Sequence, residues 1–222
     1  MTQSSSQREV GQARRLPDSR GSFVVLVGLD GSGKTTVARN ICCLAGQQGR
    51  FRKVRYFHWQ PSILGRAEIP LPEYRNLPRK LALQPTTLRR LLSAARLFKN
   101  VVRANLACLL RVGPLLRRGS LVLVDRYFYN YFLDPVSVRY YGPVWLLEQA
   151  RRFFPKPDLI VVLRAPASVL LARKQELSRE EILHQTSILD HLQFDGAQVL
   201  EVDATQPPLK IAAEILRKAA QL

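Results

Sequence analysis

The chain has 222 residues, 46% of them hydrophobic, which fits one globular domain with a single core. No apolar run approaches the roughly 20 residues that a membrane-spanning helix needs, and the N-terminus lacks the apolar segment of a secretory signal. The formal net charge is +17, with 34 basic residues against 17 acidic ones, and such an excess favours anionic partners.

The positive charge is concentrated in one part of the chain. Glu68 and Glu73 are the only acidic residues between positions 31 and 124, whereas eleven basic residues lie from Arg75 to Arg118. Such a region forms either a solvated face or a surface for nucleotides, phosphorylated substrates, nucleic acid or an acidic membrane. Because base-stacking aromatic residues do not alternate with these arginines, we expect no specific nucleic-acid partner. Peripheral contact with acidic surfaces and a homodimer both stay open.

The order of the predicted elements indicates an α/β fold. Residues 1–21 are polar and predict a disordered basic arm, and the folded domain is expected at 22–222. Short apolar runs alternate with helical stretches, which is typical of a three-layer sandwich: a parallel sheet of about five strands with helices on both faces. Strands are predicted at 22–27, 53–57, 121–124, 159–163 and 198–202, and helices at 34–48, 144–154, 167–174 and 209–221, with Ser178 or Ser187 as the cap of a further helix.

The longest predicted helix begins at Thr86 or Thr87 and runs to about Val112, where Gly113-Pro114 should interrupt it. Its apolar residues recur at helical spacing, so we expect them to be buried and the basic residues to be exposed. The apolar stripe consists of Leu88, Leu91, Leu92, Ala95, Phe98, Val102, Leu106 and Leu109, and the basic residues mostly off it are Arg89, Arg96, Lys99 and Arg103.

The three cysteines do not suggest a disulfide framework. Cys42 and Cys43 are adjacent on a predicted helix and cannot face the same way, and Cys108 lies in another helical stretch. We expect buried, reduced thiols and hence a cytoplasmic protein.

Residues 28–36 read GLDGSGKTT directly after the apolar run 23–27. This is the phosphate-binding loop pattern G-x-x-x-x-G-K-[ST] between a strand and a helix, and the alternative is a structural turn that matches by chance. Loop N–H groups converge on phosphate oxygens, Lys34 adds a positive charge for the β- and γ-phosphates, and Thr35 can bind Mg²⁺. The pattern predicts a P-loop fold that binds a nucleotide together with Mg²⁺. The candidate nucleotide-binding residues of the loop are Gly28, Asp30, Gly31, Ser32, Gly33, Lys34, Thr35 and Thr36.

A second element of the site follows the apolar run 121–124. Asp125 stands at the carboxyl end of this predicted strand, at the edge where open α/β sheets bind ligands. Its carboxylate can hold Mg²⁺ directly or through water. Together with the loop, it predicts a nucleotide and metal site.

Five motifs occur in a characteristic order. GLDGSGKTT is followed by Asp-Arg-Tyr at 125–127, PDLIVVLRAP at 157–166, Ala-Arg-Lys at 172–174 and Val-Asp-Ala at 202–204. From about residue 23 to its end the chain resembles the thymidylate kinase family of nucleoside monophosphate kinases. It resembles in particular a thymidylate-kinase-like branch from bacterial surface-polysaccharide contexts. The resemblance implies ATP- and Mg²⁺-dependent phosphoryl transfer to a small phosphorylated acceptor such as dTMP.

The resemblance also implies catalytic roles for four residues. Lys34 would hold the ATP phosphates, Asp125 would organise Mg²⁺ together with Thr35, Arg126 would contact the acceptor phosphate, and Arg173 would close over the phosphates as a lid arginine. Two simpler interpretations stay open: Arg126 pairs with Asp125, and Arg173 is a solvated helix residue.

Other positions would contact the nucleotide base and the acceptor. Asp203 and Ala204 would lie beside adenine, and Asp30 near the sugar of the acceptor. Trp59, however, stands where bacterial thymidylate kinases carry an arginine that grips the acceptor phosphate, Asn130 replaces a serine, and the Tyr-Gln pair near the base is missing. Arg103 has the family spacing to Asp125 for a helix arginine, although Arg96 is the closer local match. The candidate acceptor residues are Asp30, Trp59, Arg103, Arg126, Tyr127 and Asp134.

Aromatic residues crowd the stretch after this motif. Tyr129, Tyr131, Tyr140 and Tyr141 form either an aromatic core with a proline turn or a re-lined pocket whose rings stack on a base or sugar. Three functions follow: a kinase of a dTMP-like acceptor, a kinase of a sugar, polyol or sugar phosphate, and a non-kinase NTP-binding switch. Because Trp59 and the missing Tyr-Gln pair depart from the family pattern, we expect dTMP to be a poor acceptor.

Overall fold

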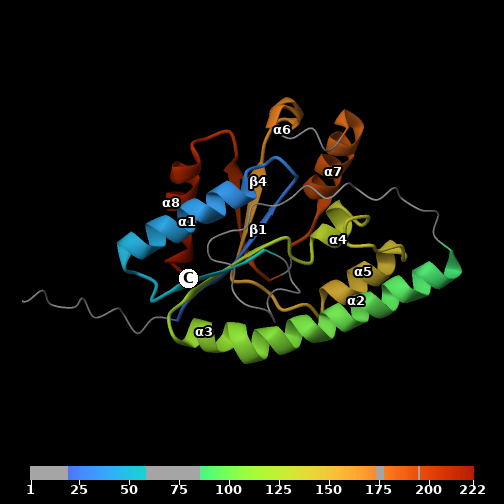
Figure 1. The fold of residues 1–222 in the computed structure, drawn as a ribbon, viewed down its shortest axis with the longest axis horizontal. Coiled ribbons are helices and arrows are strands. Elements are labelled where there is room, and N and C mark those ends of the chain that lie inside the picture. Colours follow the sequence, from blue (N-terminus) through green and yellow to red (C-terminus); the bar gives the residue numbers. More distant parts are fainter. Residues whose placement is uncertain (1–19, 59–85, 174–177, 195) are drawn as a thin grey trace, which may run out of the picture.

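The computed structural model describes residues 20–58, 86–173, 178–194 and 196–222. Over these ranges a five-stranded parallel sheet carries helices on both faces, which confirms the predicted α/β architecture (Figure 1). Each strand begins and ends within one residue of its predicted bounds. In the order β2-β3-β1-β4-β5, the strands are Val54–Phe57, Leu121–Asp125, Phe23–Gly28, Leu159–Arg164 and Gln198–Asp203.

The parallel register brings the carboxyl ends of the strands together at one edge of the sheet. Leu26 of β1 pairs with Asp125 of β3, and Phe57 of β2 pairs with Val124. The three central strands β3, β1 and β4 are apolar and buried on both faces, as expected for a parallel sheet covered by helices. The phosphate-loop motif after β1 therefore lies next to the acidic end of β3.

Two hydrophobic cores lie on the two faces of the sheet. Helices α1 (Lys34–Gln48) and α8 (Pro208–Ala219) pack against each other and cover one face, with Ile41 and Ile215 fully buried. The other core lies under the remaining helices, which are α2 (Thr87–Ala107), α3 (Gly113–Arg117), α4 (Asn130–Leu133), α5 (Val144–Arg151), α6 (Ala167–Arg173) and α7 (Arg179–His191).

The long helix does not end at Gly113-Pro114, so the predicted interruption is wrong. After α2 the chain continues through a π-helical segment, η2 (Cys108–Val112), directly into α3. The N–H of Gly113 donates to the carbonyl of Cys108, five residues earlier. This wider turn accommodates Pro114, whose ring would otherwise clash with the carbonyl four residues before it.

The burial predicted for the stripe on α2 is also wrong. The side of α2 that faces the core consists mainly of small residues, with Ser93, Leu97, Ala104 and Ala107 buried. Small side chains let the helix pack closely, which turns the large apolar residues outward. These exposed residues are Leu88, Leu91, Leu92, Phe98, Val102, Leu106, Leu109 and Leu110.

Helix caps and cysteines complete the comparison with the sequence. Thr86 Oγ1 accepts from the N–H of Arg89 at 3.3 Å, and Ser178 forms a capping box with Glu181, so these two residues are the caps.

All three cysteines are free. Cys43 is exposed, contrary to expectation, and burial raises the pKa of the half-buried Cys42 to about 11. No helix in the described ranges is long and apolar enough to cross a membrane.

Candidate active site

The loop between β1 and α1 has the backbone of an anion-binding turn. Gly31 and Gly33 adopt positive φ angles of 87° and 84°, which glycine reaches without steric cost. A Cβ atom on Gly28 would come within 2.7 Å of Ser32 Oγ and 2.9 Å of the Leu163 carbonyl oxygen. The helix α1 begins at Lys34, so its positive end faces the loop.

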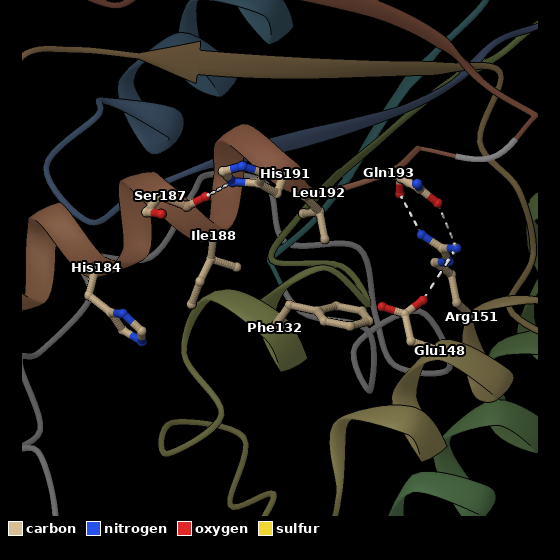
Figure 2. Close-up of a pocket in the computed structure, with 9 residues that line it drawn as sticks. All are labelled: Phe132, Glu148, Arg151, His184, Ser187, Ile188, His191, Leu192 and Gln193. Carbon is tan, nitrogen blue, oxygen red and sulfur yellow. Dashed lines mark hydrogen bonds and ion pairs between the residues drawn. The ribbon is translucent and has the colours of Figure 1, made fainter.

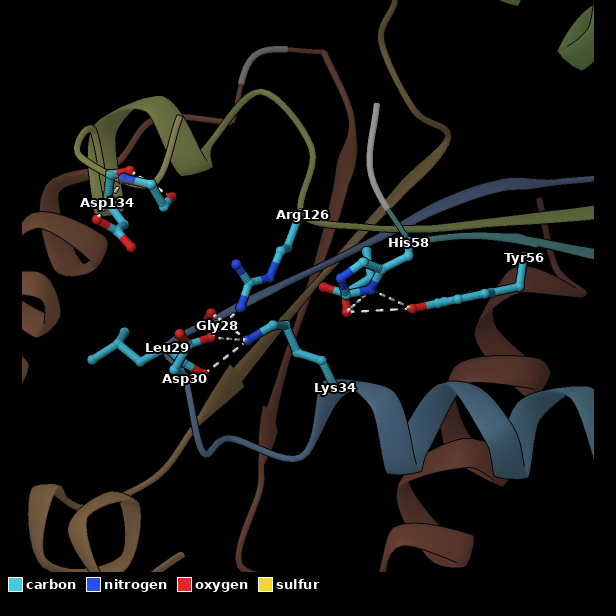
Figure 3. Close-up of polar contacts among 10 residues, drawn as sticks. Gly28, Leu29, Asp30, Lys34, Tyr56, His58, Arg126 and Asp134 are labelled. Atoms are coloured by element: carbon cyan, nitrogen blue, oxygen red, sulfur yellow. Dashed lines mark hydrogen bonds and ion pairs between the residues drawn. The ribbon is translucent and has the colours of Figure 1, made fainter. Parts of the chain in front are cut away.

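The Lys34 side chain is 7% exposed and folds over this loop. Its Nζ donates to the carbonyl oxygens of Gly28 and Leu29, each at 2.8 Å, and lies 3.9 Å from Asp30 Oδ1 (Figure 3). The ammonium group is thus already at the phosphate loop, held by oxygen acceptors.

Arg126 joins the same group from the other side. It follows β3 with a φ of 57°, a left-handed conformation that costs a non-glycine residue about 1–2 kcal/mol. Its guanidinium donates to Asp30 Oδ1 at 2.8 Å (Figure 3). The partner is therefore Asp30, and the simpler expectation of a pair with Asp125 is not what the structure shows. Asp30 links the two cations Lys34 and Arg126.

Asp125 is 1% exposed, at the carboxyl end of β3. Burial raises the pKa of this carboxyl, while Lys34, His58 and Arg126 oppose the rise. Its Oδ2 lies 3.5 Å from the Tyr56 hydroxyl and 3.7 Å from His58 Nδ1. Its Oδ1 has no hydrogen-bond partner among the described residues. A buried carboxylate oxygen of this kind fits a cation site.

Tyr56 and His58 are site residues that the sequence prediction missed. The Tyr56 hydroxyl lies 3.1 Å from His58 Nδ1, so both side chains surround the Asp125 carboxylate. The strand register contained the signal: Phe57 pairs with Val124, so the next residues on the two parallel strands face each other. Knowing the strand order would have placed residue 58 opposite residue 125.

The donor atoms fit a magnesium–phosphate complex. Ser32 Oγ and Asp125 Oδ1 are both buried without a hydrogen-bond partner among the described residues. Thr35 is half-buried at the start of α1, and Thr36, one residue on, is exposed. Hydroxyl and carboxylate oxygens are the ligands that Mg²⁺ prefers. Thr35 and Asp125 could therefore hold the ion, with phosphate oxygens as further ligands.

Arg173, the last residue of α6, contacts the segment after β5. Its guanidinium donates to the Ala204 carbonyl at 2.9 Å, so it is not simply a solvated helix residue. The Ala204 N–H donates to the Arg164 carbonyl at 2.7 Å, which anchors this segment to β4. Hydrogen bonds from Thr205 lower the pKa of Asp203. The residues expected at the adenine and at the lid are thus in contact.

The aromatic cluster after Arg126 is core and not pocket. Tyr127 is 2% exposed and its hydroxyl donates to the Pro155 carbonyl at 2.7 Å. Tyr129, Tyr131 and Tyr140 are also buried, so the interpretation as an aromatic core with a proline turn is right for them and the stacking surface is wrong.

The remaining acceptor candidates are Asp134, Arg103 and Trp59. Asp134 ends α4, where its Oδ1 accepts from the N–H of Ser137 at 3.3 Å, and Figure 3 shows it apart from the group around Arg126. Arg103 is half-buried on α2, whereas Arg96 donates to the Arg139 carbonyl at 3.0 Å. Trp59 lies outside the described residues.

A cavity of about 560 Å³ lies between α4, α5 and α7 (Figure 2). In it, Arg151 pairs with Glu148 at 3.3 Å and also bonds Gln193, so its charge is neutralised within the protein. No residue of the phosphate loop lines the cavity, and we give it no part in phosphoryl transfer. Its lining residues are Phe132, Glu148, Arg151, His184, Ser187, Ile188, His191, Leu192 and Gln193.

Comparison with known proteins agrees with this geometry. Residues 26–215 match the family model described as thymidylate kinase. A thymidylate kinase of Xanthomonas campestris pv. campestris (strain B100) is 28% identical over 215 residues, covering 90% of this chain and 81% of that protein. A thymidylate kinase of Thermosynechococcus vestitus is 29% identical over 217 residues, covering 88% and 85%. A probable thymidylate kinase of Pyrococcus abyssi is 32% identical over 163 residues, covering 69% and 70%.

Proposed function

Because the chain belongs to the thymidylate kinase family and is an ATP-dependent phosphotransferase, we propose that it transfers the γ-phosphoryl group of ATP to a small phosphorylated acceptor, a nucleoside monophosphate of the dTMP type. The main support from the geometry is the linked group Lys34–Asp30–Arg126, at 3.9 and 2.8 Å. It joins a donor-side cation to an acceptor-side cation at the edge where the strands end. Phosphoryl transfer needs this kind of positioning and charge neutralisation more than covalent chemistry.

On the donor side, the loop N–H groups and Lys34 bind the ATP phosphates. Lys34 exchanges the Gly28 and Leu29 carbonyls for phosphate oxygens, which are charged and therefore stronger acceptors. Thr35 and Asp125 would hold Mg²⁺, which when bound would neutralise part of the charge on the transferring group. Asp203 and Ala204 lie beside adenine, and Arg173 moves from Ala204 to the phosphates.

On the acceptor side, Arg126 binds the acceptor phosphate and Asp30 the sugar. A guanidinium presents donors along two edges, so Arg126 can keep its bond to Asp30 while it contacts a phosphate. Tyr127 is buried beneath this segment and positions Arg126. Trp59, Arg103 and Asp134 complete the acceptor site in this proposal.

A kinase of a sugar, polyol or sugar phosphate is the second candidate. Trp59 in place of a phosphate-gripping arginine and the missing Tyr-Gln pair favour it. The experiment that separates the two is nucleotide consumption by the purified protein against nucleoside monophosphates, sugars and sugar phosphates, with each product identified by its mass. Turnover with none of them above the Lys34→Ala background would contradict both.

Three further properties belong to the proposal. The catalytic unit is one domain over residues 22–222, and its place is the cytoplasm. Its partners besides the acceptor are a second copy of the chain or an acidic surface.

A further inference from the structure

The two carboxylate oxygens of Asp125 have different surroundings. Oδ2 lies 3.5 Å from the Tyr56 hydroxyl, whereas Oδ1 has no hydrogen-bond partner among the described residues. The rotamer of an aspartate does not fix this difference, because the last torsion of the side chain is broad and roughly two-fold. A neighbouring group must therefore decide which oxygen the protein holds and which one is left for a ligand.

The strand register places three polar side chains on one face of the sheet. Tyr56 of β2 pairs with Leu123 of β3, and side chains two residues apart on a strand point to the same face. His58 and Asp125 are the next residues on that face, which α1 and α8 cover. The ends of two neighbouring strands thus bring a phenol, an imidazole and a carboxylate together.

The Tyr56 hydroxyl is held at this place by its ring. The side chain is fully buried in the core under α1, so it cannot swing out to solvent. A buried phenol needs a hydrogen-bond partner. The hydroxyl lies 3.1 Å from His58 Nδ1 and 3.5 Å from Asp125 Oδ2 (Figure 3). Tyr56 therefore links His58 to Asp125.

The single proton of the Tyr56 hydroxyl limits the direction of these contacts. If Tyr56 donated to His58, the buried Oδ2 of Asp125 would lose its donor, which is costly. His58 Nδ1 lies 3.7 Å from Oδ2, too far to replace that donor. When instead His58 donates from Nδ1 to Tyr56 and Tyr56 donates to Asp125, each bond polarises and strengthens the next.

We propose that Tyr56 and His58 are positioning residues of the magnesium site. The chain from His58 through Tyr56 holds Oδ2 of Asp125 and keeps Oδ1 turned toward the ion. This role rests on the proposed function, in which Thr35 and Asp125 hold Mg²⁺. Carboxylates that bind a metal are themselves hydrogen-bonded in proteins, and loss of such a partner lowers metal affinity by about 10–100-fold.

The chemistry of His58 favours orientation over direct metal binding. Mg²⁺ prefers oxygen ligands, whereas an imidazole nitrogen suits metals such as Ni²⁺ and Zn²⁺. Within the ranges that the structure describes, no three His, Cys, Asp or Glu side chains are grouped so as to hold a metal ion. Both Tyr56 and His58 therefore act through Asp125.

The test is calorimetric titration of the full chain with ATP, at a series of Mg²⁺ concentrations and with a chelator. Tyr56→Phe should raise the Mg²⁺ concentration that gives half of the metal-dependent gain in affinity by about 10–100-fold. Affinity for ATP in the chelator should stay unchanged. The control is Tyr140→Phe, which removes a hydroxyl that donates to the Pro143 carbonyl at 2.9 Å. An unchanged Mg²⁺ requirement, or an equal loss with and without Mg²⁺, would overturn the assignment.

Variants of His58 test the direction of the chain. His58→Asn keeps an N–H donor near the position of Nδ1 and should retain most of the Mg²⁺ affinity. His58→Leu removes the donor and should raise the Mg²⁺ requirement, by a smaller factor than Tyr56→Phe. Because both residues act through one hydroxyl, the double variant should need no more Mg²⁺ than Tyr56→Phe alone. Independent losses that multiply would contradict the chain, and a greater loss with Ni²⁺ than with Mg²⁺ would make His58 a metal ligand.

Asp125→Asn is the reference for these titrations. If it raises the Mg²⁺ requirement and neither Tyr56→Phe nor His58→Leu does, the positioning role is wrong and the metal site stands. If none of the three raises it, Asp125 is no metal ligand and the positioning role falls with it. Thermal unfolding shows whether Tyr56→Phe folds, and if it does not, the variants of the less buried His58 decide the result. The titrations need no turnover, so the acceptor panel tests the kinase proposal separately.

Discussion

Asp30 holds two cations in place at the candidate active site. Its Oδ1 lies 2.8 Å from the Arg126 guanidinium and 3.9 Å from Lys34 Nζ. Without such a counter-ion, two positive groups this close together would repel each other. The carboxylate therefore orders both side chains before substrates bind, which reduces the reorganisation needed in the transition state.

Lys34→Ala should abolish phosphoryl transfer and leave the fold intact. The ammonium group is the loop's point charge for the β- and γ-phosphates, and electrostatic groups of this type contribute on the order of 10²–10³ in rate each. The measurement is steady-state ATP turnover, with thermal unfolding as a check of the fold. Lys53→Ala, at an exposed lysine before β2, is the control and should keep full activity. Turnover of Lys34→Ala near the wild-type value would show that the active site lies elsewhere.

Asp125→Asn should weaken nucleotide binding more in the presence of Mg²⁺ than in its absence. The amide keeps the size of the side chain but loses the charge that attracts the ion. Calorimetric titration with ATP, with Mg²⁺ and with a chelator, measures the two affinities. Equal losses under both conditions would remove Asp125 from the metal site and leave it a structural group next to Tyr56 and His58.

Asp125 should also make the stability of the ligand-free protein depend on pH. Burial raises its pKa above the ordinary value of 3.8, so between the two pKa values the folded state keeps a proton that the unfolded state releases. Stability then falls as pH rises through this window, and Asp125→Asn removes the effect. The unfolding temperature of the variant minus that of wild type should grow from about pH 4 upward and level off above the folded-state pKa. Glu214→Gln is the control, and a difference independent of pH would contradict the argument.

At the scale of elements, the pattern of hydrophobic residues predicted the positions of the strands correctly. It predicted the burial of the apolar stripe on α2 wrongly. The three central strands are apolar on both sides, so burial was the only arrangement available to them. On α2, periodicity groups Leu91, Phe98 and Leu109 on one side but does not say which side the core covers. The answer depends on Ala104 and Ala107, whose small size lets the opposite side approach the core.

In the candidate site too, some residues could be predicted from the sequence and others could not. Sequence motifs located Lys34 and Asp125 because each belongs to a local pattern next to a strand. His58 and the Arg126–Asp30 pair depend on which strands are neighbours and on a left-handed backbone at Arg126, and no local pattern reports either feature.

The capping box of α7 gives a prediction about one element. Ser178 accepts from the N–H of Glu181 at 3.2 Å and the Glu181 carboxylate accepts from the N–H of Ser178 at 2.8 Å. Ser178→Ala should therefore lower the free energy of unfolding by about 1 kcal/mol. Ser187→Ala, in the interior of the same helix on an exposed face, should change it by less than half of that. Urea unfolding of both variants measures the difference, and equal losses would mean that the cap does not stabilise α7.

For the whole molecule, we predict that dTMP is a poor acceptor. An arginine–phosphate hydrogen bond contributes about 1.5–3 kcal/mol, and the position of the phosphate-gripping arginine of bacterial thymidylate kinases is Trp59 here. The value of kcat/KM with dTMP should lie well below the usual enzyme range of about 10⁴–10⁸ M⁻¹s⁻¹. Steady-state kinetics with dTMP and ATP decide the matter. An efficiency inside that range would show that the acceptor site is rebuilt around the same substrate, and the non-nucleotide acceptor should then be dropped.

The π-helical turn η2 sets the rotational phase of α2 relative to the rest of the molecule. Each residue of an α-helix advances the chain by about 100°, and a π-turn accommodates one residue more than the α-helical ladder would. Deleting one residue between Cys108 and Val112 would restore an unbroken α-helix into α3 and turn α2 about its own axis by about that angle. The leucines of the outer face would swing toward one flank, and Arg96 would leave the Arg139 carbonyl. The one extra residue of η2 therefore fixes the rotation of α2 about its axis, and with it which side chains of α2 face solvent.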